Sequence, residues 1–175
     1  FLAETSTGRI IRKLSNFLSD PHSDALRYID SSGTWSPDGS RFAYVVFAGG
    51  DNEVVIVDAS NGDVRERLAF DDIGAISNPA WSPDGRYMAF SGMVGGLSDL
   101  YLWDFQEEEL TRLTNDRYAD FHPAWSPDGS TLAFATDRGE ETDFEKLTYS
   151  KFQIATLTLR NLSLIHISEP TRLRR

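Results

Sequence analysis

Apolar and polar positions form short runs along most of this chain, and turn residues separate the runs, which is typical of β-strands. Three runs, at 41–47, 86–90 and 131–135, are apolar at successive positions, as in strands buried on both faces. Other runs, such as 64–68 and 109–113, alternate charged with apolar residues, as in outer strands with one face in water. The pattern therefore predicts an all-β protein in which buried strands are followed by amphipathic ones.

The pentapeptide Trp-Ser-Pro-Asp-Gly occurs before each of the three apolar runs. Its copies begin at Trp35, Trp81 and Trp125, so they are 46 and then 44 residues apart. Proline sets φ at the first central position of a tight turn, aspartate bonds neighbouring amides, and glycine accepts a positive φ. We therefore expect the motif to serve the fold, with its tryptophan buried. Its other members are Pro37, Asp38, Gly39, Pro83, Asp84, Gly85, Pro127, Asp128 and Gly129.

A period of about 45 residues that holds four strands predicts a β-propeller, in which four-stranded antiparallel blades repeat around a central channel. Strand A ends at the tryptophan motif, strand B follows its glycine, strand C is the next apolar run, and strand D is the amphipathic partner of C. The chain is expected to hold two complete blades and two partial ones. Their predicted bounds are about 1–15, 33–69, 78–114 and 122–160.

Charge and composition exclude several classes of function. A formal net charge of -10 argues against binding to nucleic acid or to an anionic membrane surface, because both favour clustered lysines and arginines. The chain contains no cysteine, so disulfides, thiolate metal ligands and thiol nucleophiles are absent. The longest apolar run, at 42–48, is far shorter than the roughly 20 residues that cross a bilayer. We expect no nucleic-acid partner and no direct membrane insertion.

The second repeat resembles the WD40-like (PD40) repeat of TolB-like β-propellers. The residues that carry the resemblance are 78–90, 99–104 and 111–114. The third repeat, at 122–138, matches equally well, whereas the first departs at Gly33 and Thr34, where the proline is missing. The resemblance covers about residues 1–161. It implies a bacterial protein of the periplasm or cell envelope that binds a protein or peptide, without a cofactor.

Residues 162–175 break the repeat. A turn and a D strand are expected after the last C strand at 152–159, but residues 162–172 resemble the translation of a transposase sequencing adapter. We therefore expect 1–161 to be a propeller fragment and 162–175 to be a non-native tail.

Propeller geometry places the D–A and B–C loops at one end of the blades and the A–B and C–D turns at the other. The loops of the first group differ in length and charge between repeats, and a specific binding site needs such variation. The residues predicted to contact a partner are Asp72, Asn78, Arg117, Tyr118, Asp120, His122, Asp137 and Arg138.

The same loops contain candidate residues for metal binding and catalysis. His122 could be a metal ligand or general base, but a single histidine is more often a hydrogen-bonded structural residue. The carboxylates of 137–145 lack the ligand spacing of an EF-hand, so a solvated acidic loop is the favoured interpretation. We therefore predict no metal, cofactor or catalytic residue.

A non-catalytic interaction module is the favoured function, because no hydrolase, metalloprotease or phosphate-loop motif is present. Two alternatives stay open. The chain could be the accessory propeller of a prolyl-oligopeptidase-type serine peptidase, or the propeller segment of a larger outer-membrane-associated protein. Only flanking sequence would separate these three.

Overall fold

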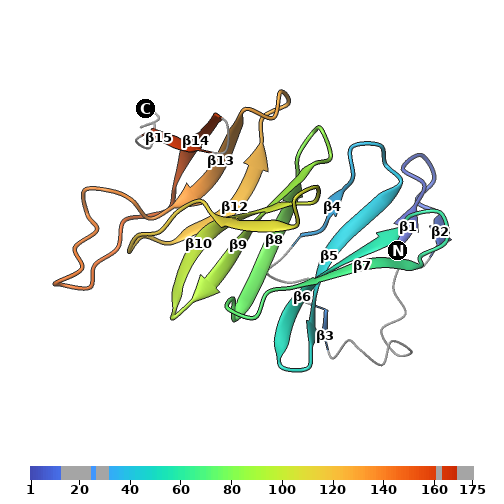
Figure 1. Ribbon diagram of the computed structural model, residues 1–175, viewed down its shortest axis with the longest axis horizontal. Helices are drawn as coiled ribbons and strands as arrows, with labels where there is room; N and C mark the ends of the chain where they lie inside the picture. The colour runs from blue at the N-terminus through green and yellow to red at the C-terminus, as the bar shows by residue number, and fades with distance from the viewer. Residues whose placement is uncertain (13–24, 27–31, 161–162, 169–175) are drawn as a thin grey trace.

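The structure is a computed structural model that describes residues 1–12, 25–26, 32–160 and 163–168 (Figure 1). Within these ranges the regular secondary structure is β-strand, as the sequence predicts. The residues within these ranges form no helix with the length and apolar character that crossing a membrane requires.

Antiparallel sheets of four or five strands are the repeating unit. The first large sheet has the order β3-β5-β6-β7, and β4 also pairs with β5. Its strands are β3 (Ala25–Leu26), β4 (Thr34–Trp35), β5 (Arg41–Ala48), β6 (Asp51–Asp58) and β7 (Val64–Ala69). Before it, β1 (Leu2–Ala3) and β2 (Ile10–Arg12) form a two-stranded sheet.

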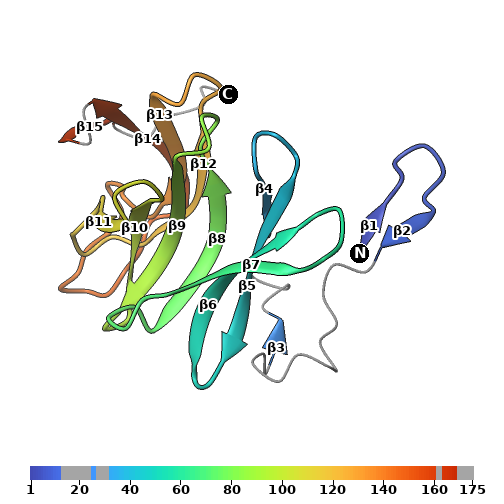
Figure 2. The same cartoon turned by 45° about the vertical axis from the view of Figure 1, so that its right-hand side comes forward.

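The second and third sheets repeat this arrangement, and their strands are neighbours in chain order. The second contains β8 (Ala75–Trp81), β9 (Tyr87–Val94), β10 (Leu97–Asp104) and β11 (Glu109–Arg112). The third contains β12 (Asp120–Trp125), β13 (Thr131–Thr136), β14 (Gln153–Arg160) and β15 (Ser163–Ser168). Figure 2 shows the three larger sheets side by side. The predicted all-β, blade-like architecture is confirmed.

Strand β15 lies inside the tail that the sequence predicts to be non-native. It pairs antiparallel with β14, from Thr156 opposite Ser168 to Arg160 opposite Ser163, and so stands where a D strand belongs. Strand pairing does not test the origin of these residues, which stays a prediction. The rest of the tail, at 162 and 169–175, lies outside the described residues, as does 13–15 of the first predicted blade.

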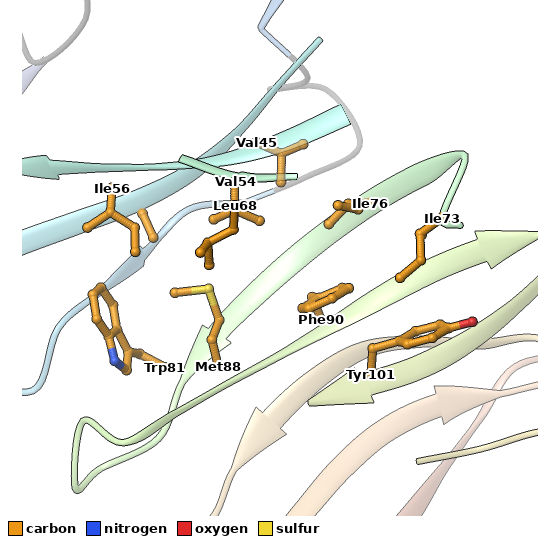
Figure 3. Packing of buried hydrophobic residues seen from close by; sticks show 11 residues of the cluster. Val45, Val54, Ile56, Leu68, Ile73, Ile76, Trp81, Met88, Phe90 and Tyr101 are labelled. Carbon is orange, nitrogen blue, oxygen red and sulfur yellow. The ribbon is translucent and has the colours of Figure 1, made fainter. Parts of the chain in front are cut away.

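The first two sheets pack face to face through buried apolar side chains (Figure 3). The first sheet contributes Ala43, Val45, Val54, Ile56 and Leu68, and the second contributes Ile76, Trp81, Met88, Phe90 and Tyr101. The second and third sheets pack in the same way through Ala89, Leu100, Leu102, Leu113, Leu132, Phe134, Ala155 and Leu157. Strand β9 thus buries side chains on both faces, as predicted.

Equivalent positions of successive sheets hold the same residue. Ala43, Ala89 and Ala133 each lie at the same place in strand B, and the first two are completely buried by the following sheet. On the third sheet this face is open among the described residues. Ile154, which corresponds to the fully buried Leu100, is 70% exposed.

The pentapeptide forms the predicted turn in all three repeats. Gly39, Gly85 and Gly129 have φ values of 70°, 76° and 70°, and each glycine N–H donates to the carbonyl of the serine three residues earlier at 2.9 Å. A Cβ on Gly85 would lie 3.8 Å from Pro37, and one on Gly129 would lie 3.7 Å from Pro83. Successive turns are therefore adjacent at one end of the sheets.

The tryptophans differ from expectation in one repeat. Trp81 is buried and Trp125 is half-buried, but Trp35 is 44% exposed, which contradicts its predicted burial. The aromatic contact described for its ring is with Phe42 of its own sheet, whereas Trp125 donates its indole N–H to the Ala80 carbonyl of the preceding sheet.

Candidate partner-binding loop face

Loops of the second and third sheets meet around a cavity of about 320 Å³. The β9–β10 loop, the β11–β12 loop and the β13–β14 loop all contribute to it. Its lining includes Leu97, Arg117, Asp137, Phe144, Leu147 and Tyr149. The D–A and B–C loops therefore lie together at one end of the sheets, and we name this end the loop face.

Alternating cations and rings connect two of these loops. The Arg117 guanidinium carbon lies 4.8 Å from the centre of the Phe144 ring, and that ring is 5.3 Å from the ring of Tyr118. The Arg138 guanidinium carbon lies over the ring of Tyr118, 5.1 Å from its centre. Guanidinium–aromatic contacts each contribute on the order of 0.5–2 kcal/mol. The stack holds the β13–β14 loop against the β11–β12 loop.

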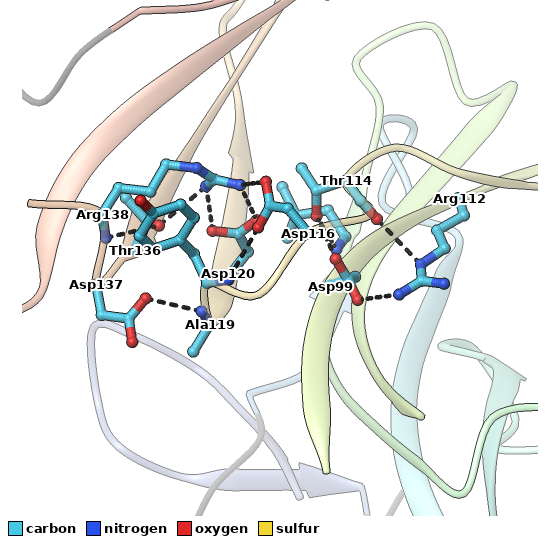
Figure 4. A network of polar contacts seen from close by, with 11 residues as sticks. Asp99, Arg112, Thr114, Asp116, Ala119, Asp120, Thr136, Asp137 and Arg138 are labelled. Carbon is cyan, nitrogen blue, oxygen red and sulfur yellow. Dashed lines mark hydrogen bonds and ion pairs between the residues drawn. The ribbon is translucent and has the colours of Figure 1, made fainter. Parts of the chain in front are cut away.

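Beneath the stack, Arg138 forms a buried ion-pair network (Figure 4). Its Nη1 donates to Asp120 Oδ1 at 2.5 Å, its Nη2 donates to Asp120 Oδ2 at 3.0 Å, and Nη2 also pairs with Asp116. Asp120 is fully buried at the start of β12. Burial raises the pKa of its carboxyl, and the bonds from Arg138 and Thr136 oppose that rise.

The charge on Arg138 is favoured by the same contacts. Burial alone would lower the pKa of the guanidinium, but its bonds to Asp120 and Asp116 raise it. A second pair lies beside the first, where Arg112 Nη2 donates to the buried Asp99 at 2.5 Å. Thr114 contacts both members of this second pair, because its hydroxyl donates to Asp99 Oδ1 at 3.2 Å and its carbonyl accepts from Arg112 Nε at 3.1 Å.

Three carboxylates of this network are close enough to surround a cation. Oxygens of Asp99, Asp116 and Asp120 lie within 4.8 Å of one another. Two guanidiniums already compensate their charge, and a metal ion would have to displace Arg138 from two of its partners. We therefore interpret the cluster as an ion-pair scaffold that fixes the loops around the cavity.

Asp137 holds the β11–β12 loop in place at the side of the cavity. Its Oδ1 accepts the Ala119 N–H at 2.8 Å, and the Ala119 carbonyl accepts the Asp137 N–H at 3.3 Å. The side chain is buried apart from the part that lines the cavity. This reciprocal pair sets the position of the backbone that carries Arg117.

Two of the residues predicted to contact a partner lie at a shift in strand register that occurs in both β8 and β12. Asn78 and His122 have φ values of 53° and 56°, and each lies where the register of strand A shifts, between Ser77 and Ala80 or between Phe121 and Ala124. Asn78 is buried, whereas His122 is exposed. The carboxylate cluster found among the described residues does not include His122. These positions form a bulge that recurs in two sheets.

The structure therefore divides the predicted residues into groups. Arg117 and Tyr118 lie in the β11–β12 loop, where Arg117 is exposed at the cavity, while Asp72 is exposed in the β7–β8 turn. Asp120, Asp137 and Arg138 make their described contacts inside the protein, beneath the cavity, and their contact with a partner stays a prediction.

The sequence pattern did not predict the roles of several residues of the loop face. Asp99, Arg112 and Asp116 belong to the ion-pair network, and Leu97, Phe144, Leu147 and Tyr149 line the cavity. Phe144, Leu147 and Tyr149 could have been noticed in the sequence, because they are apolar side chains within the otherwise acidic and polar β13–β14 loop.

Comparison with known proteins points to one family. A sequence profile described as the TolB beta propeller domain, PD40, matches residues 25–167. Over 39 residues the chain is 49% identical to the Tol-Pal system protein TolB of Escherichia fergusonii, a match that covers 22% of this chain and 9% of that protein.

Solved structures agree with this match. TolB from Acinetobacter baumannii is similar with a TM-score of 0.59 and 28% identity, over 76% of this chain and 30% of that one. The β-propeller domain of the Trilobed protease from Pyrococcus furiosus, at 18% identity and a TM-score of 0.58 over 86% of this chain and 45% of that one, shares the fold alone. The chain thus spans well under two thirds of these relatives. Because the profile covers most of its length and its sheets are arranged as blades, the chain belongs to the TolB beta propeller domain family.

Proposed function

We propose that this chain is a non-catalytic interaction module of the bacterial periplasm or cell envelope, and that it binds a protein or peptide through the loop face. The observation that carries the proposal is the cavity, which loops of two neighbouring sheets enclose with apolar side chains and an exposed arginine. The name of the relative from Escherichia fergusonii, a Tol-Pal system protein, supports a role in an assembly of proteins.

The opposite end of the sheets is poorly suited to specific recognition. It carries three copies of one turn, and in each copy the aspartate already accepts the hydroxyl of the serine two residues before it. The loop face instead exposes apolar side chains, with Leu147 at 70% and Tyr149 at 58% exposure. Exposed apolar groups beside polar ones are typical of protein-binding surfaces.

Site-specific photocrosslinking in cells of the source organism tests the proposal. A photoreactive amino acid replaces Tyr149 on the loop face or, as the matched control, exposed Asn61 in the β6–β7 turn. We expect discrete protein adducts from the first position and none from the second. Adducts formed only from position 61 would show that the other end is the binding face.

An identified partner then permits a quantitative comparison by calorimetry. Arg117→Ala should weaken its binding, whereas Ser40→Ala in the opposite turn should leave the affinity unchanged. The reverse result would contradict the assigned face. The peptidase alternative gains no specific support, because the likeness to the Trilobed protease propeller shows the fold alone.

A further inference from the structure

We propose that the cavity binds a peptide segment of a partner protein in which an apolar side chain stands next to an acidic one. The apolar side chain enters the cavity, and the neighbouring carboxylate pairs with Arg117. This inference rests on the proposed function and adds the chemistry that the loop face recognises.

Arg117 differs from most arginines that the structure describes. Six others have a carboxylate within ion-pair distance, namely Arg9, Arg65, Arg67, Arg86, Arg112 and Arg138. Among the described residues, the recorded partner of the Arg117 guanidinium is the ring of Phe144. In a chain with a net charge of -10, this leaves an available cation at the wall of an apolar cavity.

A carboxylate is the group that such a cation selects. The planar guanidinium offers paired N–H donors that match the two oxygens of a carboxylate. Its contact with Phe144 restrains the side chain before binding, so less conformational entropy is lost when the ion pair forms. Apolar surroundings also strengthen the attraction relative to bulk water.

The size and lining of the cavity favour a peptide side chain. About 320 Å³ is at the lower end of the range of roughly 300–1,000 Å³ that ligand sites occupy, so it suits one or two side chains. Leu97, Leu147 and Tyr149 are 42%, 70% and 58% exposed at its walls. An inserted apolar side chain would cover them and remove their surface from water.

Asp137 determines where the acid must lie. Its buried carboxylate also lines the cavity, so it would repel a second carboxylate that entered with the apolar group. Arg117 therefore pairs with a carboxylate only when the acidic residue is next to the apolar residue that enters the cavity. Together, the positive charge of Arg117 and the negative charge of Asp137 favour a segment with an apolar residue next to an acidic one over an acidic side chain that enters the cavity alone.

Matched peptide pools test this inference with the full-length protein that contains the chain. The probes are fluorescent ten-residue peptides, blocked at both ends, with random uncharged flanks and a fixed central pair. The pairs are Leu-Asp, Phe-Asp, Leu-Asn, Leu-Lys and Ser-Asp. We expect the first two pools to bind about tenfold more tightly than the others, the effect of one charge-assisted hydrogen bond or of losing the apolar group.

Three variants assign the preference to its residues. Arg117→Leu should remove the preference for Asp over Asn while the preference for Leu over Ser remains, and Arg117→Lys should restore part of the first. Leu147→Asp should weaken the binding of the Leu-Asp and Phe-Asp pools. Arg65→Leu removes an equal charge from β7 and should change nothing. Binding that does not distinguish Asp from Asn, or an Arg117→Leu variant that still does, overturns the inference.

The outcome is separable from that of the proposed function. If position 149 crosslinks to a partner but the Asp pools show no preference, the loop face binds proteins and the apolar–acidic inference is wrong. If only position 61 crosslinks, the proposed function fails first. If both tests succeed, the sequence of the crosslinked partner should contain the preferred pair at the adduct.

Discussion

At the scale of single residues, the turns show how one side chain fixes a backbone. Asp38 Oδ1 accepts the Ser36 hydroxyl at 2.6 Å and the Ser40 N–H at 3.0 Å, and Asp128 repeats these contacts with Ser126 and Ser130. The serine hydroxyl contributes most to holding the pKa of each carboxyl at about 2, below its ordinary value of 3.8. The ionised form therefore fits the turn.

These aspartates predict a dependence of stability on pH. Because the folded pKa is below the unfolded one, the stabilisation is present above about pH 4 and is lost as the pH falls towards 2. In Asp128→Asn the melting temperature should therefore fall less between pH 5 and pH 2 than it does in the wild type. Circular dichroism melts across this range measure it, with exposed Asp72→Asn as the control. Equal slopes for Asp128→Asn and wild type would show that the turn carboxylate contributes nothing.

Gly85 and Trp81 predict losses of stability by two different mechanisms. At φ 76°, a β-branched valine in place of Gly85 is strained, which costs about 1–3 kcal/mol. Trp81→Ala leaves a cavity between the first two sheets, which costs about 3–5 kcal/mol. Denaturant unfolding of the full-length protein measures both. Loss of partner binding with unchanged unfolding would instead give the motif a direct functional role.

At the scale of elements, the ion-pair network connects the start of β12 to the loops around it. If Asp120 faced a partner, as the sequence predicts, Asp120→Ala would lower the melting temperature little. Because the side chain is completely buried against Arg138, we expect a large loss of stability instead. Removing one partner of a buried pair leaves the other charge without compensation.

We therefore expect Asp120→Ala to lower the free energy of unfolding by about 3–5 kcal/mol. The double variant Asp120→Leu with Arg138→Leu should lose less than this, because it buries no unpaired charge. Exposed Arg117→Ala removes one exposed guanidinium–aromatic contact and should lower stability by about 1 kcal/mol or less. Urea unfolding compares the three. A double variant that is less stable than Asp120→Ala would contradict the ion-pair scaffold.

The elements also show how far prediction from the sequence reaches. Strand pairing follows from a period and turn residues that are local, so the blade pattern and the positive φ of Gly85 were predictable. The network depends on residues such as Arg138, whose partners lie 18 and 22 positions away in neighbouring loops. No local pattern shows that such a charge turns inward. The apolar residues of the acidic loop gave a weak signal, but their common cavity depends on tertiary structure.

At the scale of the whole molecule, the described residues leave one face of the third sheet uncovered. Ile154 is exposed where Leu100 and Val54, the equivalent residues of the other sheets, are completely buried. The half-buried Ala133 lies on the same face of this sheet. Apolar sheet faces of this kind lead to association in water.

We expect residues 1–161, prepared alone, to self-associate. Ile154→Lys should shift the population towards monomer, whereas Val64→Lys, on the exposed side of β7, should not. Sedimentation velocity at several protein concentrations measures the distribution. A monodisperse monomer that unfolds cooperatively would contradict the expectation.

The recurrence of alanine at the same position of strand B also has an evolutionary consequence. Ala43 and Ala89 lie on sheet faces that receive the following repeat, and Ala133 lies on the corresponding face of the third. A duplication of one whole repeat in the gene would therefore create a copy of an existing contact surface and would require no new one. Such a gene can gain or lose repeats while its remaining interfaces stay intact, and selection can then act on the loops alone.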